Sequence, residues 1–246
     1  MDLTSLDFTA VWKFREALAW GLWTTLWLAA AGFAIAVPAG LLLALGRLRG
    51  AWWLRGLILG FVDVVRFTPL LVQAVWIHFA LPALTGVSTS VTASGLVALS
   101  LHVSAYVCEI MRAGIVAIPK GQWEAARAMG LRPRPIFRLV ILPQVWPLVL
   151  PPLANVAVST LKLTSILSII AIDDLLKVAN RINASAYRPL EIFTAAALIY
   201  LAVGLLLAWG AAALERRYGA GRLRLPAAVA PALAPIPLAV GGRHGP

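Results

Sequence analysis

The sequence has little charge. Only 13% of its 246 residues are Asp, Glu, Lys or Arg, whereas a soluble domain carries about a quarter. Apolar residues make up 61% of the chain, and the mean hydropathy is +0.87. This composition excludes an ordinary soluble globular domain for most of the chain and indicates an integral membrane protein.

Cysteine is nearly absent, because Cys108 is the single one, and this excludes a disulfide within the chain. Cys108 lies in an apolar stretch, where it is expected to be a small packing residue. The histidines His78, His102 and His244 have no spacing typical of metal ligands, so no metal site is expected. His78 and His102 are interpreted as groups that form hydrogen bonds between helices.

The sequence also lacks the phosphate-binding motif G-x-x-x-x-G-K-[ST], so the chain itself is not expected to hydrolyse ATP. Its formal net charge of +11 would suit a nucleic-acid-binding protein. The basic residues, however, fall at the ends of apolar runs, which is typical of contacts with lipid headgroups. We therefore expect membrane lipid and no nucleic acid as a partner.

Long uncharged runs predict five membrane-spanning helices. The 30 residues between Glu16 and Arg47 carry no charge, and about 20 suffice to cross a bilayer. The uncharged run 67–108 is long enough for two spans, because residues 81–90 are rich in Pro, Gly and small polar residues and predict a turn. The last two spans are expected at residues 143–171 and 191–215.

The distribution of Lys and Arg predicts the orientation. Of the 21 basic residues, 14 lie in the segments 46–55, 112–138 and from 216 onwards. Because basic loops favour the cytoplasm, the N-terminus is expected outside and the C-terminus inside. The predicted parts are an extracytoplasmic segment 1–16, a transmembrane domain 17–215 and a basic, Pro/Ala-rich cytoplasmic tail 216–246 that we expect to be disordered.

The segment between the third and fourth spans, residues 118–144, predicts a short helix. Pro119 suits a helix start, GQWEAARAM contains good helix formers, and Gly130 suits a left-handed C-terminal cap. Such a helix is roughly 13 Å long. From composition alone, a solvated connecting loop that rests on the membrane surface is the favoured interpretation.

Several motifs in this order resemble the permeases of ATP-binding-cassette (ABC) importers, and in particular their polar amino acid branch. EAARAMG followed by ILPQ resembles the EAA loop of those permeases, RFTPLLVQ (66–73) resembles their second-span motif, and NVAVSTLKLTSILSII (Asn155–Ile170) their fourth-span motif. The resemblance covers about residues 20–215.

The resemblance implies an all-α integral membrane protein with the type I ABC importer permease fold, which has five transmembrane helices and a short cytoplasmic coupling helix between the third and fourth. It implies a permease subunit in the bacterial inner membrane for a polar amino acid or related small solute. The implied partners are a second permease subunit, identical or homologous, two ABC ATPase subunits that hold ATP and Mg²⁺, and an extracytoplasmic solute-binding protein. The implied ATPase-coupling residues are Glu124, Ala125, Ala126 and Gly130.

Two other functional classes remain as alternatives. A secondary transporter would need internal repeats or ion-coupling carboxylates at mid-depth, and neither stands out. A membrane-embedded enzyme would need a catalytic constellation within the spans, and the sequence presents none.

Ionisable groups inside the membrane indicate where solute passes, because each costs ~2.5–3.5 kcal/mol to insert. Lys162 lies past the middle of the fourth span, beside Thr164 and Ser165. It is expected either to face the translocation path and attract a carboxylate, or to pair with a carboxylate of the partner subunit. Asn155 and Gln73 would add hydrogen bonds on the path.

Two further charged pairs lie near the cytoplasmic side. Asp63 and Arg66 are spaced to share one helix face and are interpreted as a structural ion pair or as a gate at the inner mouth. Pro69 follows and favours a bend, because it frees a carbonyl one turn back. Glu109 and Arg112 repeat the same spacing at the end of the third span.

Two positions depart from the family pattern. Phe67 stands where the family usually has Gly, and Leu163 stands where Asp usually follows the lysine. Both departures fall among the predicted path residues. They suggest a chain that works beside an unlike second permease.

Overall fold

The computed structural model describes residues 9–218, and all of the regular secondary structure in that range is helical. The helices, in chain order, are α1 (Thr9–Lys13), α2 (Arg15–Arg49), α3 (Trp52–Phe67), α4 (Leu70–Val75), η2 (Trp76–Ala80), α5 (Leu81–Thr85), α6 (Val91–Val116), α7 (Lys120–Ala128), α8 (Pro133–Pro135), η3 (Ile136–Ile141), α9 (Leu142–Leu163), η4 (Thr164–Ile170), α10 (Leu175–Ala186) and α11 (Pro189–Tyr218). The predicted disordered tail begins at residue 216. Its residues 216–218 continue α11, and the rest of it, from residue 219 onwards, lies outside the described residues.

Four helical stretches in the described range are long and apolar enough to cross a membrane. They are α2, α6, the run from α8 to η4 and α11. A fifth candidate consists of α3 and the α4–α5 segment, which meet at an angle of 106°. Four of the five predicted spans correspond to these long helical runs. The predicted second span, which begins at residue 67, corresponds only to the α4–α5 half of the bent pair, because α3 starts at Trp52; that the whole pair crosses as one span stays a prediction.

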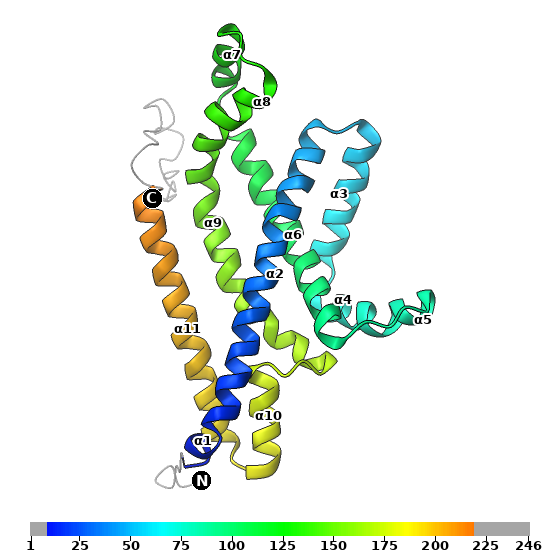
Figure 1. The fold of residues 1–246 in the computed structure, drawn as a ribbon, viewed down its shortest axis with the longest axis vertical. Helices are drawn as coiled ribbons and strands as arrows, with labels where there is room; N and C mark the ends of the chain where they lie inside the picture. The colour runs from blue at the N-terminus through cyan, green and yellow to red at the C-terminus, as the bar shows by residue number, and fades with distance from the viewer. Residues whose placement is uncertain (1–8, 219–246) are drawn as a thin grey trace, which may run out of the picture.

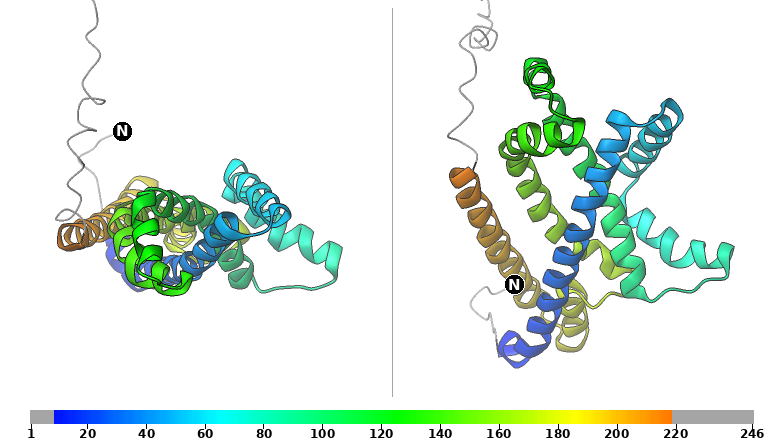
Figure 2. Two further views of the ribbon diagram at one scale, coloured as in Figure 1. Left: turned by 90° about the horizontal axis from the view of Figure 1, so that it is seen from above. Right: turned by 45° about the horizontal axis from the view of Figure 1, so that its top comes forward.

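The bend after α3 follows from Pro69, as predicted. Proline has no N–H, and it drives the preceding residue out of the helical conformation. Thr68 accordingly has extended backbone angles, φ −100° and ψ 139°, and the helix restarts at Leu70. Figure 2 shows that the segment from α4 to α5, which we call the arm, projects sideways from the other helices.

The core lies where α2 packs along α6. Small residues on α2 let the two backbones approach closely, as is typical of helices packed in membranes. A Cβ on Gly32 would lie 2.8 Å from the side chain of Leu99, and one on Gly40 would lie 2.6 Å from Val107. Larger residues at these two positions would push α2 away from α6.

The two ends of the molecule collect different elements (Figure 1). One end holds α7, α8 and the turn between α2 and α3, and α11 finishes on the same side. The opposite end holds α1 and α10. The loops predicted to be cytoplasmic thus gather at one end, which we call the inner end, and the others gather at the outer end.

Candidate coupling surface and translocation path

The short helix α7 presents two different faces. Glu124 and Ala125 are exposed, whereas Ala126 is only 1% exposed and packs in the core with the half-buried Trp123. Ala126 therefore contributes to packing within the chain, and the outward face is the part of α7 available to a partner. The other predicted coupling residue, Gly130, is also exposed.

Gly130 ends α7 in the predicted left-handed conformation. Its φ is +74°, and its N–H donates to the carbonyl of Arg127 at 2.9 Å. The next N–H, that of Leu131, donates to the carbonyl of Ala126 at 3.3 Å. Because a side chain is strained at this φ, glycine fixes the direction in which the chain leaves α7.

Two contacts hold α7 against the spans, and the sequence did not indicate either of them. The guanidinium of Arg49, at the end of α2, lies 5.9 Å from the ring centroid of Trp123 and 5.2 Å from that of Phe137. The amide of Gln144 on α9 donates to the side-chain oxygen of Gln122 on α7 at 3.2 Å. Both contacts lie at the inner end, so α7 is attached to α2 and α9 by side chains at the edge of the fold.

Charged residues join α2 to α6 just below α7. Arg112 donates two hydrogen bonds of 3.1 Å to Glu109, and Arg47 of α2 pairs with the other oxygen of the same carboxylate. The Glu109–Arg112 spacing was visible in the sequence, but the contribution of Arg47 was not. One half-buried carboxylate thus holds two cations, and the cluster keeps a net positive charge.

Asp63 and Arg66 share α3 without forming an ion pair in the described structure. Arg66 is exposed, and its guanidinium lies 5.6 Å from the ring centroid of Tyr106 on α6. This cation–π contact directs Arg66 away from its own helix and toward α6. The structural ion pair between Asp63 and Arg66 is therefore not observed, and a gating role stays a prediction.

The predicted path residues of the fourth span do not all face the same way. Lys162 is exposed and, with Ser165, lines a groove of about 400 Å³ between the α9–η4 run and α11, together with Tyr200 and Gly204. Thr164 is fully buried, and its hydroxyl donates to the carbonyl of Leu161 at 2.7 Å. The groove therefore presents one amine and two hydroxyl-bearing side chains, and Thr164 is not among them.

The remaining two predicted path residues lie elsewhere. Asn155 is exposed on α9, and Gln73 lies in the first turn of α4, where its amide reaches back across the break and bonds to backbone carbonyls of Val65 and Thr68. Gln73 also contacts His102 on α6, and His78 contacts Ser94 on the same helix. The prediction that both histidines form hydrogen bonds between helices is confirmed.

Comparison with known proteins identifies the family of this chain. Residues 36–220 match the family described as binding-protein-dependent transport system inner membrane component. The chain belongs to this family. It is therefore an inner-membrane transport subunit and not itself an enzyme.

Individual relatives of the same family match most of this chain. The glutamine transport system permease protein of Escherichia coli (strain K12) is 35% identical over 212 residues, which are 86% of this chain and 97% of the relative. The L-cystine transport system permease protein of Bacillus subtilis (strain 168) is 36% identical over 83% of this chain and 88% of the relative. A crystal structure of an amino acid ABC transporter matches with a TM-score of 0.80 and 34% identity, covering 87% of this chain and 99% of that one.

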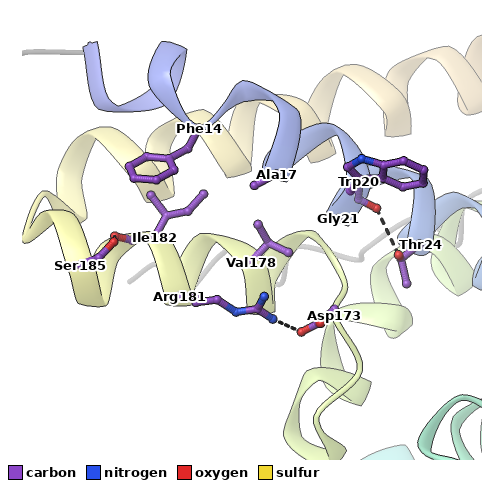
Figure 3. A pocket seen from close by; sticks show the side chains of 10 residues that line it. All are labelled: Phe14, Ala17, Trp20, Gly21, Thr24, Asp173, Val178, Arg181, Ile182 and Ser185. Carbon is purple, nitrogen blue, oxygen red and sulfur yellow. Dashed lines mark hydrogen bonds and ion pairs between the residues drawn. The ribbon is translucent and has the colours of Figure 1, made fainter.

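The outer end of the permease contains a pocket between the start of α2 and α10. It has a volume of about 370 Å³ (Figure 3), and its lining includes Trp20, Thr24 and the ion pair between Asp173 and Arg181. The indole of Trp20 is 70% exposed. The outer surface therefore combines an accessible aromatic ring with both signs of charge.

Behind this pocket, the permease buries a carboxylate that the sequence analysis did not single out. Asp174 has no exposed surface; it caps α10 by accepting from the Lys177 N–H at 3.0 Å, and it accepts from the Tyr200 hydroxyl at 3.1 Å. Beside it, the Thr25 hydroxyl accepts from the Leu175 N–H at 3.1 Å. These bonds join α2, α10 and α11, and burial raises the pKa of Asp174 above its ordinary value.

Proposed function

We propose that the chain forms the translocation path of an ATP-driven importer for a polar amino acid or related small solute. The named relatives support this solute class, since one is a glutamine permease and the other an L-cystine permease. The observation that carries the proposal is the position of Lys162 in the groove with Ser165 and Tyr200. An exposed ammonium group beside a serine suits the carboxylate that every amino acid carries.

The groove also suits an assembly role for Lys162. A carboxylate of the second permease subunit would neutralise the amine equally well and would bind the subunits together. We favour the solute, because Lys162 and Ser165 give this wall of the groove a polar character that a purely lipid-facing wall would not need.

The inner end supports coupling to an ATPase. We infer that the exposed face of α7, with Glu124 and Ala125, docks into a cytoplasmic ATPase subunit that binds ATP and Mg²⁺. Ala125 permits close approach, and Glu124 offers a charge to a basic group of the partner. Gly130 fixes the exit direction of the chain, and Arg49 holds α7 to α2.

The remaining partners follow from the exposed surfaces. Apolar side chains of the arm, among them Trp76, Phe79 and Leu84, are 49%, 59% and 75% exposed, and we assign them to contact with the second permease subunit and with lipid. An extracytoplasmic solute-binding protein would dock at the outer end, over α10. In this arrangement there are five spans, with the N-terminus outside and the C-terminus inside.

Uptake by proteoliposomes tests the solute site. The permease is reconstituted with its ATPase and its solute-binding protein, and uptake of radiolabelled amino acids is measured with and without ATP. We expect Lys162→Met to lower ATP-dependent uptake roughly tenfold, a change equivalent to ~1.4 kcal/mol, while assembly and basal ATP hydrolysis persist. Lys162→Arg should retain part of the activity, because it keeps the charge but changes the geometry.

The controls separate the alternatives. Lys13→Met removes an exposed amine from α1, outside the groove, and should leave uptake intact. Failure of Lys162→Met to assemble with the other subunits would favour the ion pair between subunits. Normal uptake by that variant would remove Lys162 from the path, and uptake without ATP would indicate a secondary transporter.

We also propose that the second permease subunit is a different chain. Phe67 and Leu163 replace the Gly and the Asp that usually occupy the two motifs of this family, and an unlike partner would supply the missing features. Active transport by this chain with the ATPase and binding protein alone would contradict the proposal.

A further inference from the structure

The bend in the second span leaves a backbone carbonyl without its helical partner. In an uninterrupted helix, the carbonyl of Val65 would accept from the N–H of residue 69. That residue is Pro69, which has no N–H. An unpaired carbonyl is costly where water is scarce, so another donor is required at this point.

The side chain of Gln73 supplies that donor. Its Nε2 lies 2.7 Å from the carbonyl oxygen of Val65, 2.7 Å from the hydroxyl of Thr68 and 3.2 Å from the carbonyl oxygen of Thr68. The Thr68 hydroxyl in turn donates to the carbonyl of Val64 at 2.8 Å. The amide thus replaces the hydrogen bond that proline removes, and it does so from the first turn of the arm across the break.

The other end of the same amide is fixed by α6. The Nδ1 atom of His102 lies 3.2 Å from Oε1 of Gln73, and His102 is only 7% exposed. Because the backbone carbonyls can only accept, the nitrogen of the amide must face them and its oxygen must face His102. Nδ1 therefore donates, and Gln73 connects α3, the arm and α6.

A second histidine ties the arm to α6 further along. Nδ1 of His78 lies 3.0 Å from the hydroxyl of Ser94, which lies 2.6 Å from the hydroxyl of Thr89. Large side chains elsewhere on the arm are exposed. The start of the arm also packs in the core through Leu70 and Ala74, which are 3% and 0% exposed. The polar contacts of Gln73 and His78 therefore add direction to an apolar contact between the arm and α6.

We propose that Gln73 is a positioning residue that sets the angle of the arm relative to α3 and α6. Gln73 contacts other groups of the protein, and it affects transport by setting the position of the arm. The proposal rests on the proposed function only for its uptake measurement; the geometric role of Gln73 holds independently.

Distance measurements between spin labels on α3 and α5 test this role directly. Val64 and Leu84 are 64% and 75% exposed, so each accepts a label as a cysteine in a Cys108→Ala background. In the assembled transporter we expect one narrow distance distribution. Gln73→Met, which keeps the length of the side chain but loses its donor and acceptor, should broaden or shift that distribution and lower ATP-dependent uptake roughly tenfold.

Two further variants make the test specific. Gln73→Glu keeps an acceptor for His102 but loses the donor for the Val65 carbonyl, so it should disturb the distance as Gln73→Met does. Pro69→Ala restores an N–H at residue 69. In a chain that carries this substitution, Gln73→Met should change the distance much less than it does in the chain that keeps Pro69. Asn180→Leu is the control, because the Asn180 amide donates to the Leu176 carbonyl within an uninterrupted helix.

The outcomes separate this role from a plain path contact. If Gln73→Met lowers uptake and leaves the distance distribution unchanged, Gln73 contacts solute and the positioning role is wrong. A wild-type distance in Gln73→Glu, or an equal effect of Gln73→Met with and without Pro69, would overturn it as well. If wild-type proteoliposomes fail to import any amino acid while the label distances behave as expected, the proposed function fails and the positioning role stands.

Discussion

The two ends of this permease are held together by different kinds of contact. At the outer end, α2, α10 and α11 share the buried Asp174, whose carboxylate is fully occupied by hydrogen bonds. At the inner end, Ala126 and Trp123 pack α7 against the core, and the polar attachments of α7 are the exposed Arg49 and an exposed bond between glutamine side chains. A buried hydrogen-bonded charge resists separation, whereas exposed contacts contribute little stability and rearrange readily. We therefore expect the outer end to stay fixed and the polar attachments of α7 to rearrange when a partner binds.

A similar contrast separates two proline-containing spans. Pro69 breaks the second span, but α9 continues through Pro147, Pro151 and Pro152. The difference lies in the packing, because α9 lies against α6, α2 and α11 over its length, whereas the arm projects from the bundle. Proline permits a bend, and the surrounding helices decide whether one forms.

The proposed topology places the two ends on opposite sides of the membrane. Single cysteines at Asn183, on α10, and at Gly121, on α7, are expected to react with a membrane-impermeant maleimide from opposite sides. The cysteine at 183 should be labelled in intact cells and the one at 121 only after the membrane is opened, an all-or-none difference. Labelling of position 121 from outside would contradict both the topology and the coupling role of α7.

The second prediction concerns the stability of the outer end. Asp174→Ala removes a helix cap and leaves the Tyr200 hydroxyl without its acceptor, so it should lower the free energy of unfolding by about 2–3 kcal/mol. Glu124→Ala on the exposed face of α7 should change it by less than about 0.5 kcal/mol. Thermal unfolding of the detergent-solubilised permease compares the two, and equal losses would remove the contrast.

The pH dependence of unfolding sharpens the same point. Because burial raises the pKa of Asp174 in the folded protein, the folded state binds this proton more tightly than the unfolded chain does. Stability contributed by Asp174 should therefore fall as the pH rises from its ordinary pKa through the raised one. Asp174→Asn, which stays neutral, should flatten this part of the curve of unfolding temperature against pH; an unchanged slope would show that Asp174 does not produce it.

The smallest effect is expected at Arg49. Arg49→Leu removes two exposed cation–π contacts, each worth about 0.5–1 kcal/mol. It should lower the free energy of unfolding by about 1–2 kcal/mol, less than Asp174→Ala does, and uptake per ATP hydrolysed a few fold. Arg49→Lys should lie between the two, because an ammonium group does not stack as a guanidinium does. Arg55→Leu is the matched control, since Arg55 donates to the carbonyl of Gly50 and not to α7. Equal coupling in all three variants would show that Arg49 does not connect α7 to α2.

Local features of the fold were predictable from the sequence because they depend on neighbouring residues. The bend at Pro69, the left-handed Gly130 and the helix before it follow from backbone chemistry that one or two residues dictate. The turn that ends the arm is equally local, with Gly86 in a left-handed conformation, but it is shorter than the predicted 81–90, because Leu81–Thr85 form α5. The Glu109–Arg112 pair follows from helical spacing alone.

The features that were missed join residues far apart in the chain. The bond between Leu175 and Thr25 spans 150 positions, and no local pattern indicates it. The same holds for Arg49 with its two rings.

Thr164 illustrates a different limit. Its polarity suggested a place on the path, but hydroxyls in membrane helices often bond to a carbonyl of the preceding turn. The structure shows this bond, to the carbonyl of Leu161. Polarity inside a span therefore marks a path only where the group faces a groove, as Lys162 does.

The most direct test of the account measures coupling at α7. ATP hydrolysis and amino acid uptake are recorded together in proteoliposomes that contain Gly130→Val, Glu124→Lys or Gly121→Val. At φ +74° a valine is strained by roughly 1–3 kcal/mol, whereas Gly121 lies on a regular helix with open space around it. We predict that the first two variants keep their ATPase and hydrolyse ATP but lose uptake, while Gly121→Val imports normally. Normal uptake per ATP in both Gly130→Val and Glu124→Lys would show that this segment is only a connector, and the proposed coupling would be wrong.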